Sequence, residues 1–577
     1  MMVRFGLGLN LSLEDVVAAA DGAQVEVSPE TIATLRERRG QICRFLEARG
    51  TPAYGFNRGF GHNVDQPVDA ADVRRLQQNL IRSHAAGMGE PMPPRIVRAT
   101  MLLRAHSLAQ GHSGVRPEVV ETIVRFLNAG ITPVVPRFGS VGASGDLAPL
   151  SHIALGLMGE GEVTRGDNPA PSPAAGALQS AGIAPLVLEM KEGLALNNGV
   201  QFSTACGLLA CAKLEDLLIT ACAATAVSCQ VMFGSDTPYA KELHELRRHP
   251  GARTVAGWLR ALCHHSPIRE AHRPYEVDGE IQDPYNLRCA PQILGACQEL
   301  IAEARTTFER EANSVTDNPL LLRDPSTGEY TLIVSGGHFH GMPVAVKLYN
   351  LVQAMATMAR LSNMRCVRYV DEARNKGLGS DLIWPGLGAR ERATSSGMMI
   401  PEYVSAALTN VLWGDAMPSH LFSLSTDAGQ EDHVSMSAGL AVRVLDMVPR
   451  LAEVLAIELA FGAQGAAIRR ESASIPSKQI SAANPAVQAA AEALRTALGA
   501  SVPAGFEPEL HVTLRCRWGA AERALSPAGE RILETVRRYF PVVQMDRELS
   551  TPLRALAAAV LEGEVTRSIA PLIAHEA

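Results

Sequence analysis

Residues 139–150 read Gly-Ser-Val-Gly-Ala-Ser-Gly-Asp-Leu-Ala-Pro-Leu, and no other segment of the 577-residue chain says more about its architecture. Prolines and glycines recur from Pro133 to Pro149 and forbid a regular helix, while the residues between them are small and largely apolar. This pattern predicts a loop that is buried and fixed in one conformation.

The tripeptide Ala143-Ser144-Gly145 in this loop has the residues that one uncommon backbone reaction needs. If the loop is bent, the Gly145 nitrogen can attack the Ala143 carbonyl carbon, because glycine has no side chain to obstruct the approach and tolerates unusual dihedral angles. Loss of two waters, one of them from the Ser144 side chain, then leaves a methylidene group conjugated to an imidazolone. The product is an electrophile made only of protein, so we expect no external cofactor.

Three other kinds of glycine-rich loop fit this segment less well. A phosphate-binding loop would need a Lys-Ser or Lys-Thr pair after the glycines, and a dinucleotide site would need Gly-x-Gly-x-x-Gly. A nucleophile elbow would need Gly-x-Ser-x-Gly, whereas the chain has Gly142-Ala143-Ser144-Gly145. Ala-Ser-Gly alone is common by chance, so the prediction depends on all twelve residues.

The composition favours packed helices around a large core. Hydrophobic residues make up 47% of the chain, aromatic residues 5% and charged residues 20%, and Ala, Leu and Val dominate the apolar share. Helical spacing begins with residues 28–50, 70–86 and 94–128. Longer helical patterns follow at residues 198–232, 289–314, 341–370, 399–414 and 434–463. We therefore predict a mainly α protein built on a bundle of long helices.

Changes in composition and charge along the chain suggest three successive domains. Residues 1–200 would carry the loop, residues 201–475 would form the long-helix bundle, and residues 476–577 would form a more charged helical tail. The segment 472–477, rich in serine, would connect the last two.

The charge of the chain argues against nucleic acid as a partner. The net charge of −7 and the absence of a Lys/Arg run give no surface for nucleic acid.

Ten cysteines are scattered without zinc-site spacing, which indicates thiols in a reducing compartment. The first residues lack an export signal, so we expect a cytoplasmic protein. The apolar stretch 217–233 is at the short limit for a membrane span, and we interpret it as a core helix.

Five separated segments together resemble the aromatic amino acid lyases and aminomutases, whose 4-methylideneimidazol-5-one (MIO) group forms from Ala-Ser-Gly. The resemblance covers about residues 50–470, and besides the Ala-Ser-Gly loop the similar segments are residues 54–61, 194–201, 282–288 and 313–319. It implies the long-helix bundle of the fumarase/aspartase-like lyases, with an N-terminal domain that carries the MIO group. It also implies an amino acid substrate and a homotetramer whose active sites are each built by several subunits.

The resemblance also implies roles for the matching residues. Tyr54, on the family's mobile loop, would be the base that removes the β-proton once the electrophile holds the amine, although a packed loop tyrosine is the alternative. Arg288 would hold the substrate carboxylate in two contacts, unless it is a surface ion-pair residue. The other residues expected to contact the substrate or the MIO group are Gly61, Asn198, Gln282, Tyr285, Asn313, His338 and Phe339.

Two segments indicate that the substrate has an imidazole side chain. Ser83-His84 and Gln430-Glu431 resemble the forms found in histidine lyases. His84 could hydrogen-bond an imidazole, and Glu431 could accept from its N–H or assist proton transfer, whereas a pocket for phenylalanine would not favour an unpaired carboxylate. Taken singly, His84 could be a core histidine and Glu431 a capping or ion-pair residue.

The activity that the resemblance implies is elimination of ammonia from L-histidine to give trans-urocanate. Open alternatives are a histidine 2,3-aminomutase that makes β-histidine, an enzyme for another aryl amino acid or a modified histidine, and a helical scaffold without catalysis. The chain departs from the histidine-lyase pattern at Arg58, Asn197, His338 and Gly429. His338 and His340 could be a metal pair, but no third ligand is indicated, so we expect no metal.

Overall fold

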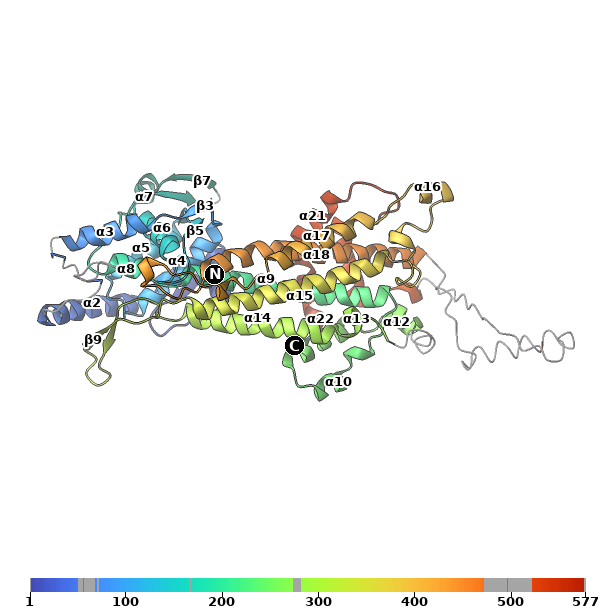
Figure 1. Cartoon of the computed structure of the whole chain (residues 1–577), viewed down its shortest axis with the longest axis horizontal. Coiled ribbons are helices and arrows are strands. Elements are labelled where there is room, and N and C mark those ends of the chain that lie inside the picture. The colour runs from blue at the N-terminus through green and yellow to red at the C-terminus, as the bar shows by residue number, and fades with distance from the viewer. Residues whose placement is uncertain are drawn as a thin grey trace. The chain divides into compact units, whose positions relative to one another are not determined.

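The computed structural model describes residues 2–49, 55–56, 68–69, 72–166, 168–272, 282–471, 496 and 521–574. The mainly helical fold predicted from the sequence is confirmed (Figure 1). The chain forms two compact units, and each collects three separate stretches of sequence. Unit 1 takes residues 1–212, 300–352 and 417–446, and unit 2 takes residues 213–299, 353–416 and 447–577. The three successive domains stay a prediction, because the expected boundary at 475/476 lies outside the described residues.

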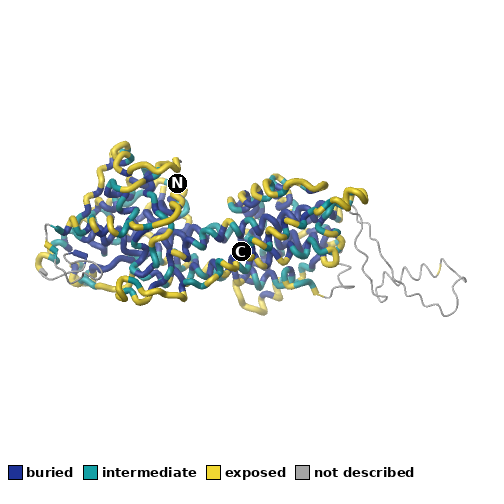
Figure 2. Tube along the Cα trace, turned by 45° about the horizontal axis from the view of Figure 1, so that its top comes forward, coloured by how far each residue is buried: buried dark blue, intermediate teal, exposed yellow. Residues whose placement is uncertain are grey.

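Unit 1 is a helical core with small sheets at its surface. Its helices are α1 (Leu13–Ala20), α2 (Pro29–Arg49), α3 (Val73–His84), α4 (Pro94–Ala109), α5 (Pro117–Asn128), α6 (Leu147–Leu157), α7 (Ala174–Ala181) and α8 (Glu192–Asn197). Every residue of α4 from Ile96 to Ala109 is buried, so this helix is the centre on which α1 and α5 pack. Figure 2 shows the same pattern of buried helices and exposed loops.

The described strands all lie in unit 1, and they pair in four small sheets. The strands are β1 (Met2–Phe5), β2 (Gln24–Val27), β3 (Met88–Pro91), β4 (Ile131–Pro133), β5 (Pro136–Phe138), β6 (Glu162–Arg165), β7 (Asn168–Pro173), β8 (Leu320–Arg323) and β9 (Tyr330–Val334). β1 and β2 are parallel, whereas β3–β5, β4–β6–β7 and β8–β9 are antiparallel. β5 leads directly into the Ala-Ser-Gly loop, and α6 follows it.

The helical pattern predicted over residues 94–128 is interrupted in the structure. Gly111 and Gly114 have φ angles of 77° and 75°, in the left-handed region that ends helices. The chain therefore turns between α4 and α5, and α5 packs back on α4 with its apolar face.

Four long helices and α17 (Met399–Gly414) confirm the longer helical patterns. The long helices are α9 (Gln201–Val231), α14 (Ala290–Ala312), α15 (Met342–Val370) and α18 (Ser437–Glu471). α18 runs through Pro449 and ends at Glu471, beyond the expected end at residue 463. It is apolar and long enough to cross a membrane, yet 94% of its most apolar stretch is buried inside the protein. α18 is therefore a core helix. The boundary between unit 1 and unit 2 falls within each of the four long helices.

Unit 2 is all helical in its described residues. Beside its parts of the long helices, it contains α10 (Lys241–Leu246), α11 (Pro250–Cys263), α12 (Pro267–His272), α13 (Tyr285–Arg288), α16 (Ala389–Ala393), α17, α20 (Pro527–Tyr539), α21 (Ser550–Leu561) and α22 (Glu564–Ile573). Side-chain hydrogen bonds to main-chain carbonyls join neighbouring long helices, from Cys297 to Ala354 and from Ser362 to Val454.

Candidate functional site

The Ala-Ser-Gly loop is bent at two glycines. Gly142 and Gly145 have φ angles of 68° and 78°, which disfavour any residue with a side chain. Gly145 forms a parallel bridge with Gly199, and the Asp146 N–H donates to the Gly199 carbonyl at 2.6 Å. A Cβ at Gly145 would collide with the Gly199 main chain. The loop therefore has the bend that the backbone reaction would require, and only glycine fits at its end.

Side chains and main chain hold the bend from both sides. The Ser140 hydroxyl accepts from the Gly142 N–H at 3.0 Å and donates to the Gly145 carbonyl at 3.1 Å. The Gly142 carbonyl accepts from the Gly341 N–H at 3.1 Å and from the Ser435 hydroxyl at 2.9 Å. Hydrogen bonds thus hold the loop in one conformation.

Ser144, at the apex of the loop, is held by two predicted site residues. Its hydroxyl donates to Glu431 Oε1 at 2.5 Å, and its carbonyl accepts from Asn198 Nδ2 at 2.8 Å. The other Glu431 oxygen accepts from the Thr426 hydroxyl at 2.6 Å. The Ser144 hydroxyl oxygen is therefore bonded to a carboxylate, which can exchange a proton with it.

Glu431 follows a tight turn with an unusual backbone. Thr426 and Glu431 form an antiparallel bridge around the 3-10 helix Asp427–Gly429, in which Asp427, Ala428 and Gly429 have φ angles of 46°, 53° and 92°. Gly429, one of the departures from the histidine-lyase pattern, suits this conformation. Gln430, the next residue, is exposed.

His84, at the end of α3, lies within electrostatic reach of Glu431. Burial lowers the pKa of His84, while the Leu80 main chain and the Glu431 carboxylate act in the opposite direction. Its Nδ1 is 3.0 Å from the Ser83 hydroxyl, which donates to the Leu80 carbonyl at 3.0 Å. Burial thus favours the uncharged form of His84, which shares a site with Glu431 and Ser144.

The turn that carries His338 and Phe339 is tied to the same loop. Its last residue, His340, bonds through Nε2 to the His433 carbonyl at 3.0 Å, and the next N–H, of Gly341, donates to Gly142. His338 is exposed and Phe339 is half-buried. Among the residues that the structure describes, no group of three or more His, Cys, Asp or Glu side chains is arranged to hold a metal ion.

Asp146 and Thr426 belong to the site but received no role from the sequence. Asp146 is fully buried, and burial raises its pKa to about 6 although the Ser203 N–H and hydroxyl both donate to it at 2.8 Å. It fastens the end of the loop to the start of α9. Its position directly after Ala-Ser-Gly was the available signal, whereas nothing near Thr426 in the sequence indicates its bond to Glu431.

The Asn313 side chain makes its hydrogen bonds away from the Ala-Ser-Gly loop. Its Nδ2 donates to the Leu11 and Glu309 carbonyls at 2.9 and 2.8 Å, and its Oδ1 is bonded to the Leu11 N–H at 2.7 Å and to His106 Nε2 at 3.1 Å. A side-chain amide offers two donors and two acceptor positions, so all four are used. Asn313 therefore fastens the N-terminal segment to α14. Asn197, another departure, is buried and bonds to Ser151 at 3.2 Å.

Gln282, Tyr285 and Arg288 lie in unit 2, on and just before α13. The Arg288 Nε donates to the Asp283 carbonyl at 3.2 Å, and its guanidinium lies over the Tyr285 ring, 4.9 Å from the centroid. Tyr285 is 68% exposed, so this pair faces away from the core of its unit. Three further residues of interest, Tyr54, Arg58 and Gly61, lie outside the described residues.

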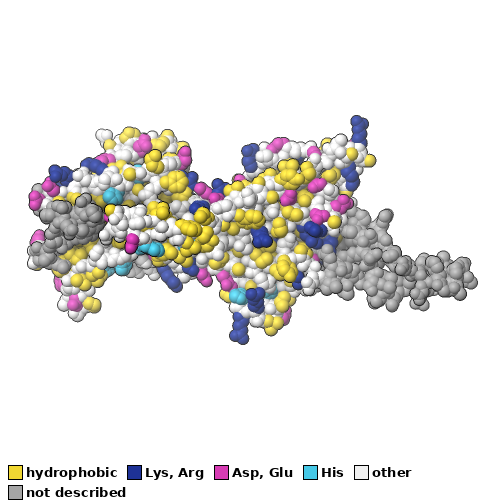
Figure 3. All heavy atoms as spheres, viewed as in Figure 1, with side chains coloured by type: hydrophobic (Ala, Val, Ile, Leu, Met, Phe, Trp, Pro, Cys, Tyr) yellow, Lys and Arg dark blue, Asp and Glu magenta, His cyan; other side chains and the backbone are white. Residues whose placement is uncertain are grey.

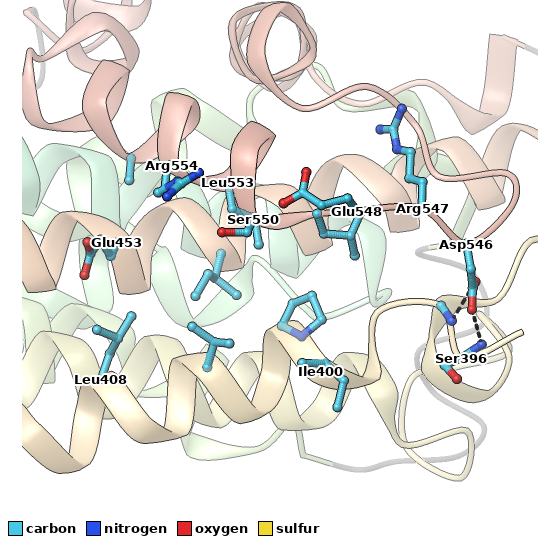
Figure 4. A pocket seen from close by; sticks show the side chains of 16 residues that line it. Ser396, Ile400, Leu408, Glu453, Asp546, Arg547, Glu548, Ser550, Leu553 and Arg554 are labelled. Carbon is cyan, nitrogen blue, oxygen red and sulfur yellow. Dashed lines mark hydrogen bonds between the residues drawn. The ribbon is translucent and has the colours of Figure 1, made fainter.

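Unit 2 also contains an apolar pocket of about 590 Å³ between α17, α18 and the segment that leads into α21. At one end, the Asp546 carboxylate accepts from the main-chain N–H groups of Ser396 and Gly397 at 2.6 and 3.1 Å (Figure 4). None of the residues that line it is a predicted site residue, so the pocket is not part of the candidate site.

The chain is similar to proteins of known activity along most of its length. The family profile described as aromatic amino acid lyase matches residues 11–496. The histidine ammonia-lyase of Burkholderia mallei (strain NCTC 10229) is 41% identical over 462 residues, which are 80% of this chain and 87% of that protein. Two solved structures are each 29% identical: a histidine ammonia-lyase from Trypanosoma cruzi (TM-score 0.79, covering 99% of this chain and 95% of that chain) and a tyrosine aminomutase from Streptomyces globisporus (TM-score 0.82, covering 99% of both).

Proposed function

Because the chain belongs to the aromatic amino acid lyase family, and is an enzyme of the ammonia-lyase type, we propose that it eliminates ammonia from L-histidine to give trans-urocanate. The observation that carries this proposal is the hydrogen bond from the Ser144 hydroxyl to Glu431. The charge of this carboxylate also raises the pKa of His84, against the effect of burial. This bond connects Ser144, which is needed to make the electrophile, to Glu431 and His84, which suit an imidazole substrate. The 41% identity to a histidine ammonia-lyase supports the same substrate.

We propose that Ala143, Ser144 and Gly145 condense into an MIO group. Three features fit this: the bend at Gly145, the carboxylate on the Ser144 hydroxyl, and the Asn198 amide on the Ser144 carbonyl, the atom that would become the ring carbonyl. Such a group would supply an electrophile for the substrate amine and so make the amine a better leaving group. Asn198 would support the negative charge that develops on that carbonyl oxygen.

The substrate side chain would lie between His84 and Glu431. An imidazole has one N–H donor and one acceptor nitrogen, so Glu431 can accept from the first. His84 can donate to the second through Nε2 in the tautomer whose Nδ1 accepts from the Ser83 hydroxyl, once that hydroxyl turns away from the Leu80 carbonyl. An aryl ring without polar atoms would leave the Glu431 carboxylate with a vacant acceptor in a partly buried site, which costs free energy. Arg288 would hold the substrate carboxylate, and Tyr54 would remove the β-proton, both by resemblance to the family. The exposed His338 would lie near the amine, and Phe339 would pack on the substrate or MIO ring.

Incubation of the purified enzyme with L-histidine tests this activity. We expect the ultraviolet absorbance of urocanate to rise together with an equimolar amount of ammonia. β-Histidine with little ammonia would instead establish an aminomutase, since that reaction returns the amine to the β-carbon. L-Phenylalanine and L-tyrosine are the control substrates, and turnover of either in preference to histidine would contradict the proposed substrate.

We also propose that the enzyme is a homotetramer. Several large apolar side chains of the single helix α17 are exposed in the single chain: Ile400, Tyr403, Val404, Val411 and Trp413. Hydrophobic side chains also make up much of the face drawn in Figure 3. Monomeric proteins rarely expose so many together. Sedimentation equilibrium should give four times the chain mass, and a fully active monomer would contradict the proposal.

We propose a cytoplasmic location for the enzyme. Fully buried thiols such as Cys222 and Cys366 suit a reducing compartment.

A further inference from the structure

We propose that the buried ion pair between Arg365 and Glu458 positions Arg288 for carboxylate binding. This inference rests on the proposed function, because it takes Arg288 as the residue that holds the substrate carboxylate. Arg365 and Glu458 would act as positioning residues, through the main chain of α13, without touching the substrate.

The guanidinium of Arg365 joins three elements of unit 2. Arg365 lies on α15 and Glu458 on α18, and both side chains are 0% exposed. Two parallel bonds join them, from Nε to Oε1 at 2.5 Å and from Nη2 to Oε2 at 2.8 Å. The remaining nitrogen, Nη1, donates to the main-chain carbonyl of Asn286 on α13 at 3.0 Å. The fork geometry of a guanidinium fixes this third direction once the first two bonds are made.

α13 needs such external contacts because it is a single turn, Tyr285–Arg288. A helix this short is not stable by itself. Its next carbonyl, of Leu287, accepts from the buried Tyr239 hydroxyl at 3.2 Å, and the Leu287 side chain is 1% exposed. Consecutive carbonyls of the turn are thus held by Arg365 and Tyr239, and the residue after them is Arg288.

Glu458 is itself fixed, so the pair cannot reorient easily. The Ser228 hydroxyl donates to Glu458 Oε1 at 2.9 Å, and the Tyr369 hydroxyl donates to Ser228 at 3.2 Å. Together they form a connected, buried polar network that ends on the Asn286 carbonyl. Networks of this kind favour one arrangement of the groups that they join.

Stability alone gives a weaker explanation of the pair. Removing two charges from water costs several kcal/mol per ion, and apolar pairs of similar volume often replace buried ion pairs without loss of stability. What an apolar pair cannot supply is a donor aimed at Asn286. The expected consequence of its loss is therefore a misplaced Arg288 in a protein that still folds.

The test is the double variant Arg365→Met/Glu458→Met in the full-length enzyme. We expect a Tm near that of the parent and formation of the MIO group, seen as loss of two waters by intact mass. The KM for L-histidine should rise about tenfold while kcat stays within about threefold, because carboxylate binding contributes to the ground state and the transition state alike. A parental KM would overturn the inference.

A matched control separates this effect from the loss of any buried arginine. Arg98 in unit 1 is buried and donates to the Ala19 and Leu127 carbonyls at 3.1 and 3.0 Å, with no bond to α13. Arg98→Met should therefore keep the parental KM. If the double variant does not fold, Arg365→Lys keeps the charge beside Glu458 but replaces the planar fork with one ammonium group, and the same rise in KM is expected.

Arg288→Ala completes a double-mutant cycle. If the pair acts through Arg288, replacing the pair in the Arg288→Ala background should add no further rise in KM. Independent, additive effects would overturn the inference. A parental KM in Arg288→Ala itself would instead overturn the proposed carboxylate role, so the two failures are distinguishable.

Discussion

Replacing Ser144 with alanine should lower kcat for L-histidine on the order of 10⁴-fold or more, the size of loss seen when an enzyme's reactive group is removed. The hydroxyl bonded to Glu431 is the only oxygen on the Ser144 side chain that can leave as water, and an alanine methyl cannot form the methylidene. Urocanate formation under saturating histidine measures the change. The Tm should stay close to that of the parent, since Ser144 adds one side-chain bond to a loop held mainly by its glycines and Ser140.

Ser180→Ala is the control for Ser144→Ala. Ser180 is exposed, and its hydroxyl donates to a carbonyl of its own helix, that of Gly176. It should keep the parental kcat. A Ser144→Ala enzyme that retains a tenth or more of the parental rate would rule out an electrophile made from this residue.

Replacing Glu431 with glutamine should lower kcat by about 10²- to 10³-fold, within the range of general acid–base effects. The amide has nearly the same shape and can keep one bond to Ser144 and one to Thr426, so the geometry of the turn is preserved. What it loses is the ability to take up a proton. Steady-state kinetics with L-histidine measures the loss, and intact mass shows whether the Ser144 dehydration or the later substrate step is affected.

The neighbouring carboxylate gives a matched control. Asp432 is exposed and next to Glu431 in the chain. Asp432→Asn removes the same charge and should leave kcat near the parental value. Equal losses in both variants would point to a general electrostatic effect, and a Glu431→Gln enzyme with the parental rate would remove Glu431 from the chemistry.

The parts of the fold that depend on local interactions could be predicted from the sequence. The long helices follow from apolar spacing, and the bent loop follows from glycines such as Gly142 and Gly145, whose conformations other residues adopt poorly. The break between α4 and α5 was missed although Gly111 and Gly114 mark it, because the apolar spacing continues on both sides.

Contacts between residues distant in sequence could not be predicted in the same way. Asn313 stands in a motif that resembles the family, yet its amide is used by Leu11 and His106, and nothing local to residue 313 indicates this. The bond from Arg365 to the Asn286 carbonyl likewise joins α15 to α13 through a geometry that spacing does not encode. Each compact unit collects three separate stretches of chain, so sequence order alone does not delimit the units.

The most direct test of the proposed chemistry is the intact mass of the purified full-length chain. An MIO group formed from Ala143, Ser144 and Gly145 requires a mass lower than that of the encoded sequence by two waters, with the deficit on the peptide that contains residues 143–145 and full mass in Ser144→Ala. A parent chain at its full encoded mass, while it converts L-histidine to urocanate, would show that the enzyme works without this group.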